Sequence, residues 1–330
     1  MKRPLVFLST LTFLVLVFAL TVWSGPLKMR FSDLFFWNDL HDSILFQFRM
    51  PKAFAAILAG SALATAGLLM QTYFQNPLAS PSVLGVTSGA SLGAALALLG
   101  SGAAYSIGSL GQLGLVFPSI AGALAVLFLI LWVSWRIPSP LTLVVIGMLF
   151  SYAVGAMVTF LMDLSSARQI QSFVIWSFGS FGGVTWTQLA LFAPLVILGN
   201  LLSLFSAKGL DALLLGEDYA KSLGVSVGRL RFAVFSAASI LAGGVTAFCG
   251  PLALIGLAVP HLARLFFPNA GHRILIPAVW ILGAATALLA EFVSQGIFEK
   301  VLPLNGVLAL FGAPFVIWIV LSRRALKGLG

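Results

Sequence analysis

Long apolar runs, separated by short segments rich in polar residues, glycine and proline, dominate this chain. A helix of about 20 apolar residues is long enough to cross a hydrocarbon layer about 30 Å thick. The pattern therefore predicts an all-α polytopic membrane protein with ten transmembrane helices. The ten runs lie near 5–24, 53–72, 83–100, 113–134, 141–162, 187–205, 230–248, 251–267, 274–290 and 304–321.

The composition agrees with a lipid environment. Of the 330 residues, 60% are hydrophobic and 8% are charged, whereas a soluble domain carries roughly 25% charged residues. The first run follows Lys2 and Arg3 but has no A-x-A-like cleavage site after it, so we expect a retained first helix. The single cysteine, Cys249, excludes an intrachain disulfide framework and a multi-cysteine metal site, and we predict no bound metal.

The charged residues indicate an orientation. Ten crossings place both termini on one side, and that side carries 12 basic residues and three acids, against six of each on the other side. Because basic residues are enriched on the cytoplasmic side of membrane proteins, we expect both termini in the cytoplasm. The net charge of +9 is then explained by topology, and no nucleic-acid partner is expected.

A weak internal repeat accompanies this topology. AAILAGSALATAG (55–67) and ASILAGGVTAFCG (238–250) are identical at seven of thirteen positions. They fall in crossings of opposite direction, which is typical of transporters built from inverted repeats. Ordinary membrane-helix composition, rich in alanine and glycine, is the alternative explanation.

Several motifs and residues that the chain lacks reduce the number of functions it could have. It has no G-x-x-x-x-G-K-[ST] motif, so it cannot hold ATP phosphates in a P-loop of its own. No acid lies at the centre of an apolar run, which argues against an ion-coupled secondary carrier, and the three histidines have neither metal-ligand nor triad spacing. A pore-forming subunit driven by a separate ATPase remains the leading hypothesis, with an ion-coupled carrier or a membrane enzyme as alternatives.

Such a subunit needs a cytoplasmic docking surface, and the charged segment LGEDYAKSLGVSVGRLR (215–231) is our candidate. We expect Asp211 to cap a first short helix that Gly216 ends. Glu217 would begin a second short helix, with Lys221 as its i+4 partner and Gly224 just beyond its end. The apolar face offered to a partner would comprise Tyr219, Ala220 and Leu223.

This segment and six others resemble the FecCD-type (BtuC-like) permeases, the membrane subunits of type II ABC importers. The resemblance covers nearly the whole chain and implies a BtuC-like fold, with one transmembrane permease domain over 1–330 and a cytoplasmic coupling loop at about 208–229. The other matching segments are RMPKAFAAILAGSALATAGLLMQ (49–71), NPLASPSVLGVTSGASLGA (76–94), WSFGSFGGVTW (176–186), GPLALIGLAVPHLARLF (250–266), LGAATALLAE (282–291) and NGVLALFGAPFVIWIV (305–320).

The resemblance also implies partners and a cargo. It implies a second permease subunit (in a homodimer or a heterodimer), two cytoplasmic ATPase subunits and an external substrate-binding protein, all at the bacterial cytoplasmic (inner) membrane. ATP and Mg would be bound by the partner ATPase, and this chain would bind no cofactor. The expected cargo is an iron chelate of the siderophore type, with haem or cobalamin as alternatives.

No catalytic residue is expected, but four groups of residues receive roles from the resemblance. Those contacting the ATPase are Leu215, Gly216, Glu217, Ala220, Leu223 and Gly224. Those forming a cytoplasmic gate are Asn76 and Leu78, with Ser139 and Pro140 as a second gate. Those docking the binding protein are Arg49 and Lys52. At the position of a third basic residue in the cobalamin member this chain has Gln295, so that either docking is weaker here or Lys300 takes the place of that residue. Those facing the transport path are Gln171 and Trp176, in an external half-helix near 169–178.

The glycines at 85, 89 and 93 form a further pattern, a ladder of small residues along the third run. Such ladders allow close helix packing. General packing and a direct role in the transport path are both open readings of this ladder.

Overall fold

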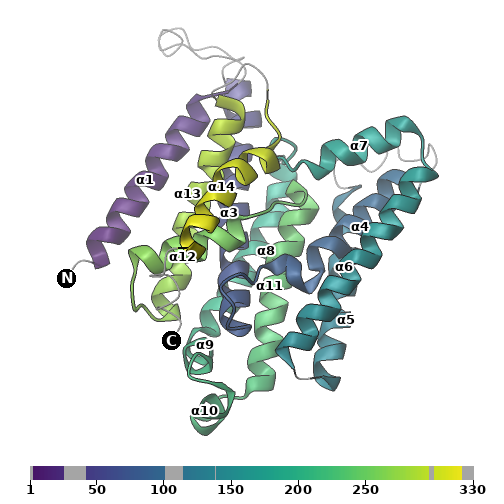
Figure 1. Cartoon of the computed structure of the whole chain (residues 1–330). Helices are drawn as coiled ribbons and strands as arrows, with labels where there is room; N and C mark the ends of the chain where they lie inside the picture. The colour runs from purple at the N-terminus through teal and green to yellow at the C-terminus, as the bar shows by residue number, and fades with distance from the viewer. Residues whose placement is uncertain (1–2, 26–41, 101–113, 138, 297–300, 322–330) are drawn as a thin grey trace.

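The computed structural model describes residues 3–25, 42–100, 114–137, 139–296 and 301–321, and within these ranges the regular structure is helical (Figure 1). A π-helical segment, η2 (Ser43–Arg49), runs directly into α3, and a short 3₁₀ turn, η3 (Pro81–Leu84), precedes α4. The α-helices are α1 (Arg3–Trp23), α3 (Met50–Tyr73), α4 (Val86–Leu99), α5 (Val116–Arg136), α6 (Pro140–Asp163), α7 (Ala167–Ser177), α8 (Trp186–Phe205), α9 (Ala207–Leu213), α10 (Glu217–Ser222), α11 (Val227–Cys249), α12 (Ile255–Phe266), α13 (His272–Gly296) and α14 (Leu304–Leu321).

Each of the ten apolar runs contains one helix, but the helices differ in length. Seven are long and apolar enough to cross a membrane, while Val86–Leu99, Ile255–Phe266 and Leu304–Trp318 are shorter apolar helices. At 1.5 Å per residue, the 12 residues of α12 extend only about 18 Å. Multi-pass membrane structure is therefore clear, whereas ten full crossings stay a prediction.

Backbone geometry explains why two of these helices are short. Gly85, before α4, has φ +76°, and Gly250 and Leu254, before α12, have φ +77° and +68°. A positive φ interrupts a right-handed helix, and glycine adopts it without a steric penalty. In both cases, part of the apolar run forms a turn or an extended segment instead of helix.

The core is built around α3, which packs against α13, α11 and α12. Alanine and glycine make up much of α3, so neighbouring backbones approach closely: a Cβ on Gly60 would collide with the carbonyl of Gly283, and one on Gly67 with that of Gly256. Small residues serve this purpose in membrane helices. By contrast, α1 and α6 are exposed along most of their length, so their apolar faces are available to lipid or to another subunit.

α3 and α11 run antiparallel. The last residue of α3, Tyr73, contacts Arg231 and Phe235 near the start of α11. The two repeated segments, 55–67 and 238–250, therefore lie in helices of opposite direction, as the sequence predicted. The structure adds that these helices are neighbours. That the two halves of the chain form a complete inverted repeat stays a prediction.

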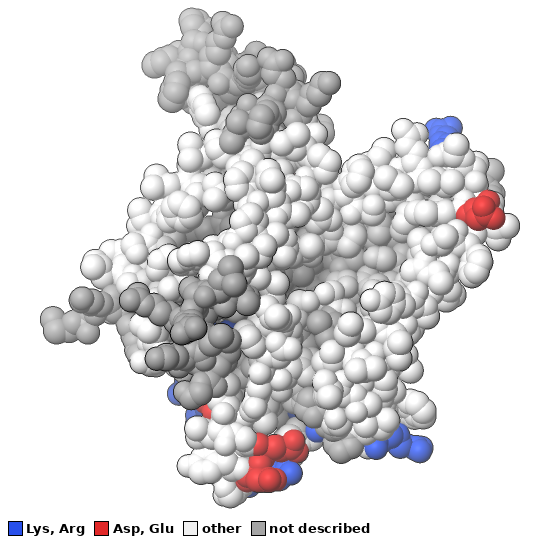
Figure 2. All heavy atoms as spheres, in the orientation of Figure 1, with Lys and Arg blue, Asp and Glu red and all other residues white. Residues whose placement is uncertain are grey.

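Charged side chains on the visible face gather at the end of the bundle that carries α9 and α10, with a few at the tip near α7 (Figure 2). Between these regions, the described residues visible in this view are almost all uncharged. A wide uncharged band between two charged ends suits a protein that spans a lipid layer. The start of α1 lies toward the α9–α10 end (Figure 1).

Candidate functional site

The predicted coupling loop, at about 208–229, contains most of α9, all of α10 and the first residues of α11. The predicted second helix is confirmed: α10 follows Gly216, which has φ +106°, and Gly224, with φ +81°, lies just beyond its end. The amide of Val225 donates to the carbonyl of Ala220 across this end, which pairs a terminal carbonyl. Both glycines hold conformations that other residues rarely adopt, so they fix the shape of the loop.

Charges along α10 are ordered as the sequence suggested. Lys221 Nζ lies 3.3 Å from a carboxylate oxygen of Glu217, one turn earlier, and 3.3 Å from one of Asp218. The hydrogen bonds to these carboxylates raise the pKa of Lys221, and the bond to Glu217 has the larger effect. The two acids lie at the start of the helix and the base at its end, which also suits the helix dipole.

The role predicted for Asp211 is wrong. Asp211 lies within α9, and one carboxylate oxygen accepts hydrogen bonds from the backbone N–H of His272, at 2.9 Å, and contacts His272 Nδ1 at 2.6 Å. It therefore pairs a terminal N–H of α13. Burial raises the pKa of Asp211, but the hydrogen bonds from His272 outweigh burial and leave that pKa below its ordinary value. Because His272 Nε2 also lies 2.8 Å from Thr72 Oγ1, α9 is linked to the end of α3.

Ala220 does not share the apolar face expected of it. It is fully buried and packs with Ala212 and Val227, so it joins α10 to α9 and to the start of α11. Tyr219 and Leu223 are exposed. The exposed apolar surface of the loop also includes residues of the turn between α9 and α10, so that it comprises Leu214, Leu215, Tyr219 and Leu223.

The predicted first gate, residues 76–78, follows α3 at the same end of the bundle. Asn76 is exposed, and its Oδ1 accepts a hydrogen bond of 2.9 Å from the N–H of Leu78, which forms a tight turn. The preceding Gln75, with φ +47°, donates through Nε2 to the carbonyl of Leu213 at 2.9 Å. The residue that precedes the predicted first gate is thus bonded directly to the coupling loop.

At the predicted second gate, the side chain of Ser139 caps α6. Its Oγ accepts a hydrogen bond from the N–H of Thr142 at 3.4 Å, and Pro140 is the first residue of the helix. Proline is favoured at this position because no intrahelical partner is lost. Serine followed by proline therefore has a clear structural role here, whereas gating stays a prediction.

Arg231 is a buried functional candidate that we did not single out in the sequence. Its Nε donates to the Tyr73 hydroxyl at 2.5 Å, and its Nη1 donates to the carbonyl of Ser134 at 3.0 Å. The guanidinium therefore joins the start of α11 to the ends of α3 and α5. The available signal was its position: Arg231 is the fifth residue of α11 and lies just inside the apolar run predicted to begin near 230, where a charge needs partners.

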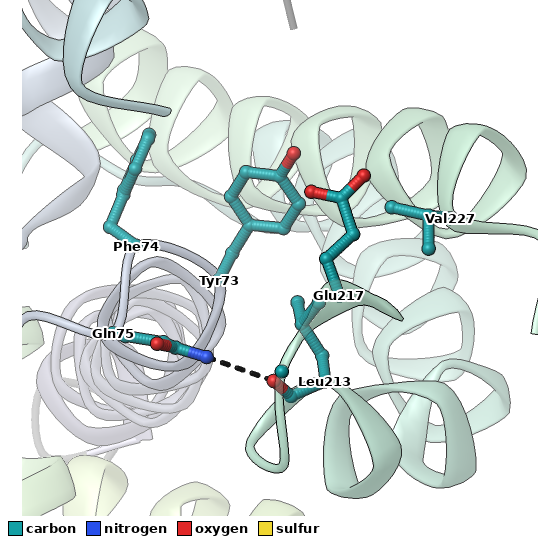
Figure 3. A pocket seen from close by; sticks show the side chains of 7 residues that line it. Tyr73, Phe74, Gln75, Leu213, Glu217 and Val227 are labelled. Carbon is teal, nitrogen blue, oxygen red and sulfur yellow. Dashed lines mark hydrogen bonds between the residues drawn. The ribbon is translucent and has the colours of Figure 1, made fainter. Parts of the chain in front are cut away.

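A small pocket separates the coupling loop from the end of α3 (Figure 3). Its volume is about 180 Å³, and Tyr73 and Phe74 form one wall while Glu217 and Val227 form the opposite wall. Gln75 reaches across the base of the pocket toward Leu213. The loop and α3 are thus held together by a few bonds across a gap, and they are not packed tightly at this point.

Arg49 and Lys52, predicted to dock a binding protein, are both buried in the chain. Arg49 donates to the terminal carbonyls of α1, including that of Val22 at 3.0 Å, and Lys52 Nζ lies 3.3 Å from Glu291 and 2.6 Å from Oε1 of Gln295. Each cation therefore has an internal structural role, and docking stays a prediction. Gln295 is a partner of Lys52, while Lys300 lies outside the described residues.

The predicted half-helix near 169–178 is confirmed as α7. Gln171 is exposed, whereas Trp176 is half-buried against Phe173, with ring centroids 5.8 Å apart. Gln171 is therefore the more accessible of the two residues assigned to the transport path. Their contact with a substrate stays a prediction.

The glycine ladder on α4 packs against α5. A Cβ on Gly89 would lie 2.6 Å from the carbonyl of Gly122, and one on Gly93 would collide with the carbonyl of Pro118. Gly85 instead forms the positive-φ residue before the helix. Close helix packing thus accounts for Gly89 and Gly93.

Comparison with known proteins connects this arrangement to membrane transport. The profile of the FecCD transport family matches residues 9–322. The chain is 32% identical to the hemin transport system permease protein HmuU of Yersinia pestis, over 98% of this chain and 97% of that protein. It is 35% identical to the Fe(3+) dicitrate transport system permease protein FecD of Escherichia coli, over 87% and 89% respectively. A solved inward-facing structure of a metal-chelate type ABC transporter superposes with a TM-score of 0.84 at 29% identity, covering 97% of this chain and 99% of that chain.

Proposed function

The chain belongs to the FecCD transport family, and we propose that it carries an iron chelate of the siderophore type into the cytoplasm as the permease subunit of a binding-protein-dependent ABC importer. One observation carries this proposal: the similarity to transport permeases extends over nearly the full length of both chains. The family supplies permease subunits of ABC transporters, and ATP hydrolysis belongs to a separate subunit.

The coupling loop supports an ATP-driven mechanism. It presents exposed leucines beside a short charged helix whose shape is fixed by Gly216 and Gly224. A rigid surface with a few apolar anchors is what a protein partner binds. We propose that two ATPase subunits bind this surface on two permease subunits, as a homodimer or a heterodimer, and that residues 76–78 and 139–140 gate the path.

The charge distribution supports the proposed orientation. Arg136, Arg264 and Arg273 belong to helix ends at the same end of the bundle as α9 and α10. The positive-inside rule makes this end cytoplasmic, with the external binding protein at the opposite end. We propose that the three shorter helices complete ten crossings, arranged as an inverted repeat, in the bacterial inner membrane.

The cargo follows from the relatives. HmuU is a hemin permease and FecD an Fe(3+) dicitrate permease, so we propose an iron chelate, with haem or cobalamin as the alternative cargo. The test is reconstitution of the permease with its ATPase and binding protein in liposomes. Ferric dicitrate, a ferric hydroxamate, haemin and cobalamin are offered separately, and we expect ATP-dependent uptake of a ferric chelate. Uptake of cobalamin alone would refute the iron assignment.

A further inference from the structure

Residues of α9 and α10 in the coupling loop pack on the first turn of α11. Gly209 of α9 packs on Leu230, because a Cβ there would lie 2.9 Å from Leu230 Cδ1. Ala220 of α10 shares a buried cluster with Val227. A displacement of the loop therefore moves the start of α11 with it.

Arg231 follows Leu230 and leads from this clamped segment to two other helices. Its guanidinium binds the hydroxyl of Tyr73, the last residue of α3, and the carbonyl of Ser134, the third residue from the end of α5. α3 leads into Asn76 three residues later, and Ser139 lies five residues beyond Ser134. One side chain thus joins the coupling loop to the helix ends that precede both predicted gates.

The chemistry of arginine suits this position. The last four carbonyls of a helix lack intrahelical partners, and the helix end carries partial negative charge; Ser134 provides one of these carbonyls in α5. A guanidinium is permanently charged and offers five N–H donors in a fixed plane, so it can hold two acceptors at once. A lysine ammonium at position 231 would keep the charge without that fixed two-sided geometry.

We propose that Arg231 is the positioning residue that carries movement of the coupling loop to the end of α5, and thereby to Ser139, while keeping it in step with the end of α3. This inference rests on the proposed function, in which an ATPase moves that loop. The end of α3 has a further bond to the loop, between Gln75 and Leu213. The pocket in Figure 3 lies between α10 and the end of α3, so α10 acts on α3 through these bonds and through α11, which packs on α3.

The test measures movement at each gate without requiring a known substrate. Leu78→Cys and Ser139→Cys are introduced separately, both at exposed positions, and Cys249 remains because it is buried. Maleimide labelling rates are measured on the permease–ATPase complex, without nucleotide and with Mg-ATP plus vanadate. Nucleotide is expected to change the rate at each position by about 5-fold or more, as is typical of coupled sites.

In this assay, R231K is expected to reduce the nucleotide-dependent change in labelling rate at position 139 to less than about twofold, below the range typical of coupled sites. The change at position 78 should be weaker than in the original protein. Y73F removes only the hydroxyl on α3, so it is expected to weaken the response at 78 and preserve it at 139. R273K changes an exposed arginine at the same end of the bundle and is the matched control. ATPase co-purification and thermal stability of each variant separate loss of coupling from loss of folding.

Three outcomes would overturn the proposal. The first is an unchanged response of R231K at position 139, equal to that of R273K. The second is a nucleotide response of Y73F that is unchanged at position 78, or lost equally at positions 78 and 139. If R231K fails to assemble with the ATPase, the Y73F result alone tests the proposal. The third is an absence of any nucleotide response in the unsubstituted background, which would refute ATP-driven movement of both gates and thus the proposed function as well.

Discussion

Truncating the exposed leucines of the coupling loop is expected to weaken binding of the ATPase. Leu215 is 66% exposed and Leu223 58% exposed, which is unusual for leucine at a water-facing surface. Fully burying a leucine side chain contributes about 1.5–3 kcal/mol. Covering the remaining exposed part of each would contribute about 1–2 kcal/mol, so L215A or L223A should each weaken binding by about tenfold.

The double variant sharpens this prediction. If the two side chains act independently, L215A/L223A should lose about 2–4 kcal/mol, or about 100-fold in affinity at the middle of that range. Affinity is measured by titrating the detergent-solubilised permease with its labelled ATPase. Leu149, which is 62% exposed on α6, provides a control: L149A should leave the affinity unchanged. An affinity within about twofold of the original in the double variant would refute the docking role of this surface.

Three further predictions concern stability, each read from thermal unfolding in detergent. K52M should destabilise the fold by about 3–5 kcal/mol, because it leaves the buried Glu291 carboxylate without its cation. K52M/E291Q should recover part of this loss. Equal melting temperatures of K52M and K52M/E291Q would contradict the pairing. The pKa of Asp211 is lower in the folded protein, so its contribution to stability is present above its unfolded pKa and is lost as pH falls through the folded value. D211N should therefore be less stable than the original protein at neutral pH and should lose less stability on acidification. Parallel profiles of stability against pH for the two proteins would exclude this role. G67A should lower the stability of the fold by about 1–3 kcal/mol, because the added methyl group forces α3 away from α12. G155A is the control and should not destabilise the fold, because a Cβ there meets no atom within 4 Å. Equal melting temperatures of G67A and G155A would refute the close approach at Gly67.

The helical architecture was readable from the sequence because membrane spans impose long apolar runs. The short helix α10 was also predictable, since Gly216 and Gly224 flank a segment with acids at its start and a base at its end. Both signals are local: they depend on residues within a few positions of one another. The lengths of α4 and α12 were overestimated because hydropathy does not register a turn at positive φ inside an apolar run.

The partners of polar residues could not be predicted because they lie far away in the sequence. Asp211 looked like the cap of its own helix, yet it caps α13, 61 positions away. Lys52 looked like an external docking residue, but Glu291 and Gln295 on α13 surround it. Arg231 was counted as one of several cytoplasmic charges, although its contacts join three helices. Charge alone does not distinguish a surface side chain from one buried by tertiary packing.

The most direct test of the central claim is the energy dependence of uptake in proteoliposomes. The permease is reconstituted with its ATPase, the binding protein is supplied outside, and accumulation of a ferric chelate is followed with ATP enclosed. The account predicts uptake that requires ATP, disappears when the P-loop lysine of the ATPase is replaced, and persists with an ionophore present. Uptake that continues without the ATPase and collapses with the ionophore would contradict it and would indicate an ion-coupled carrier.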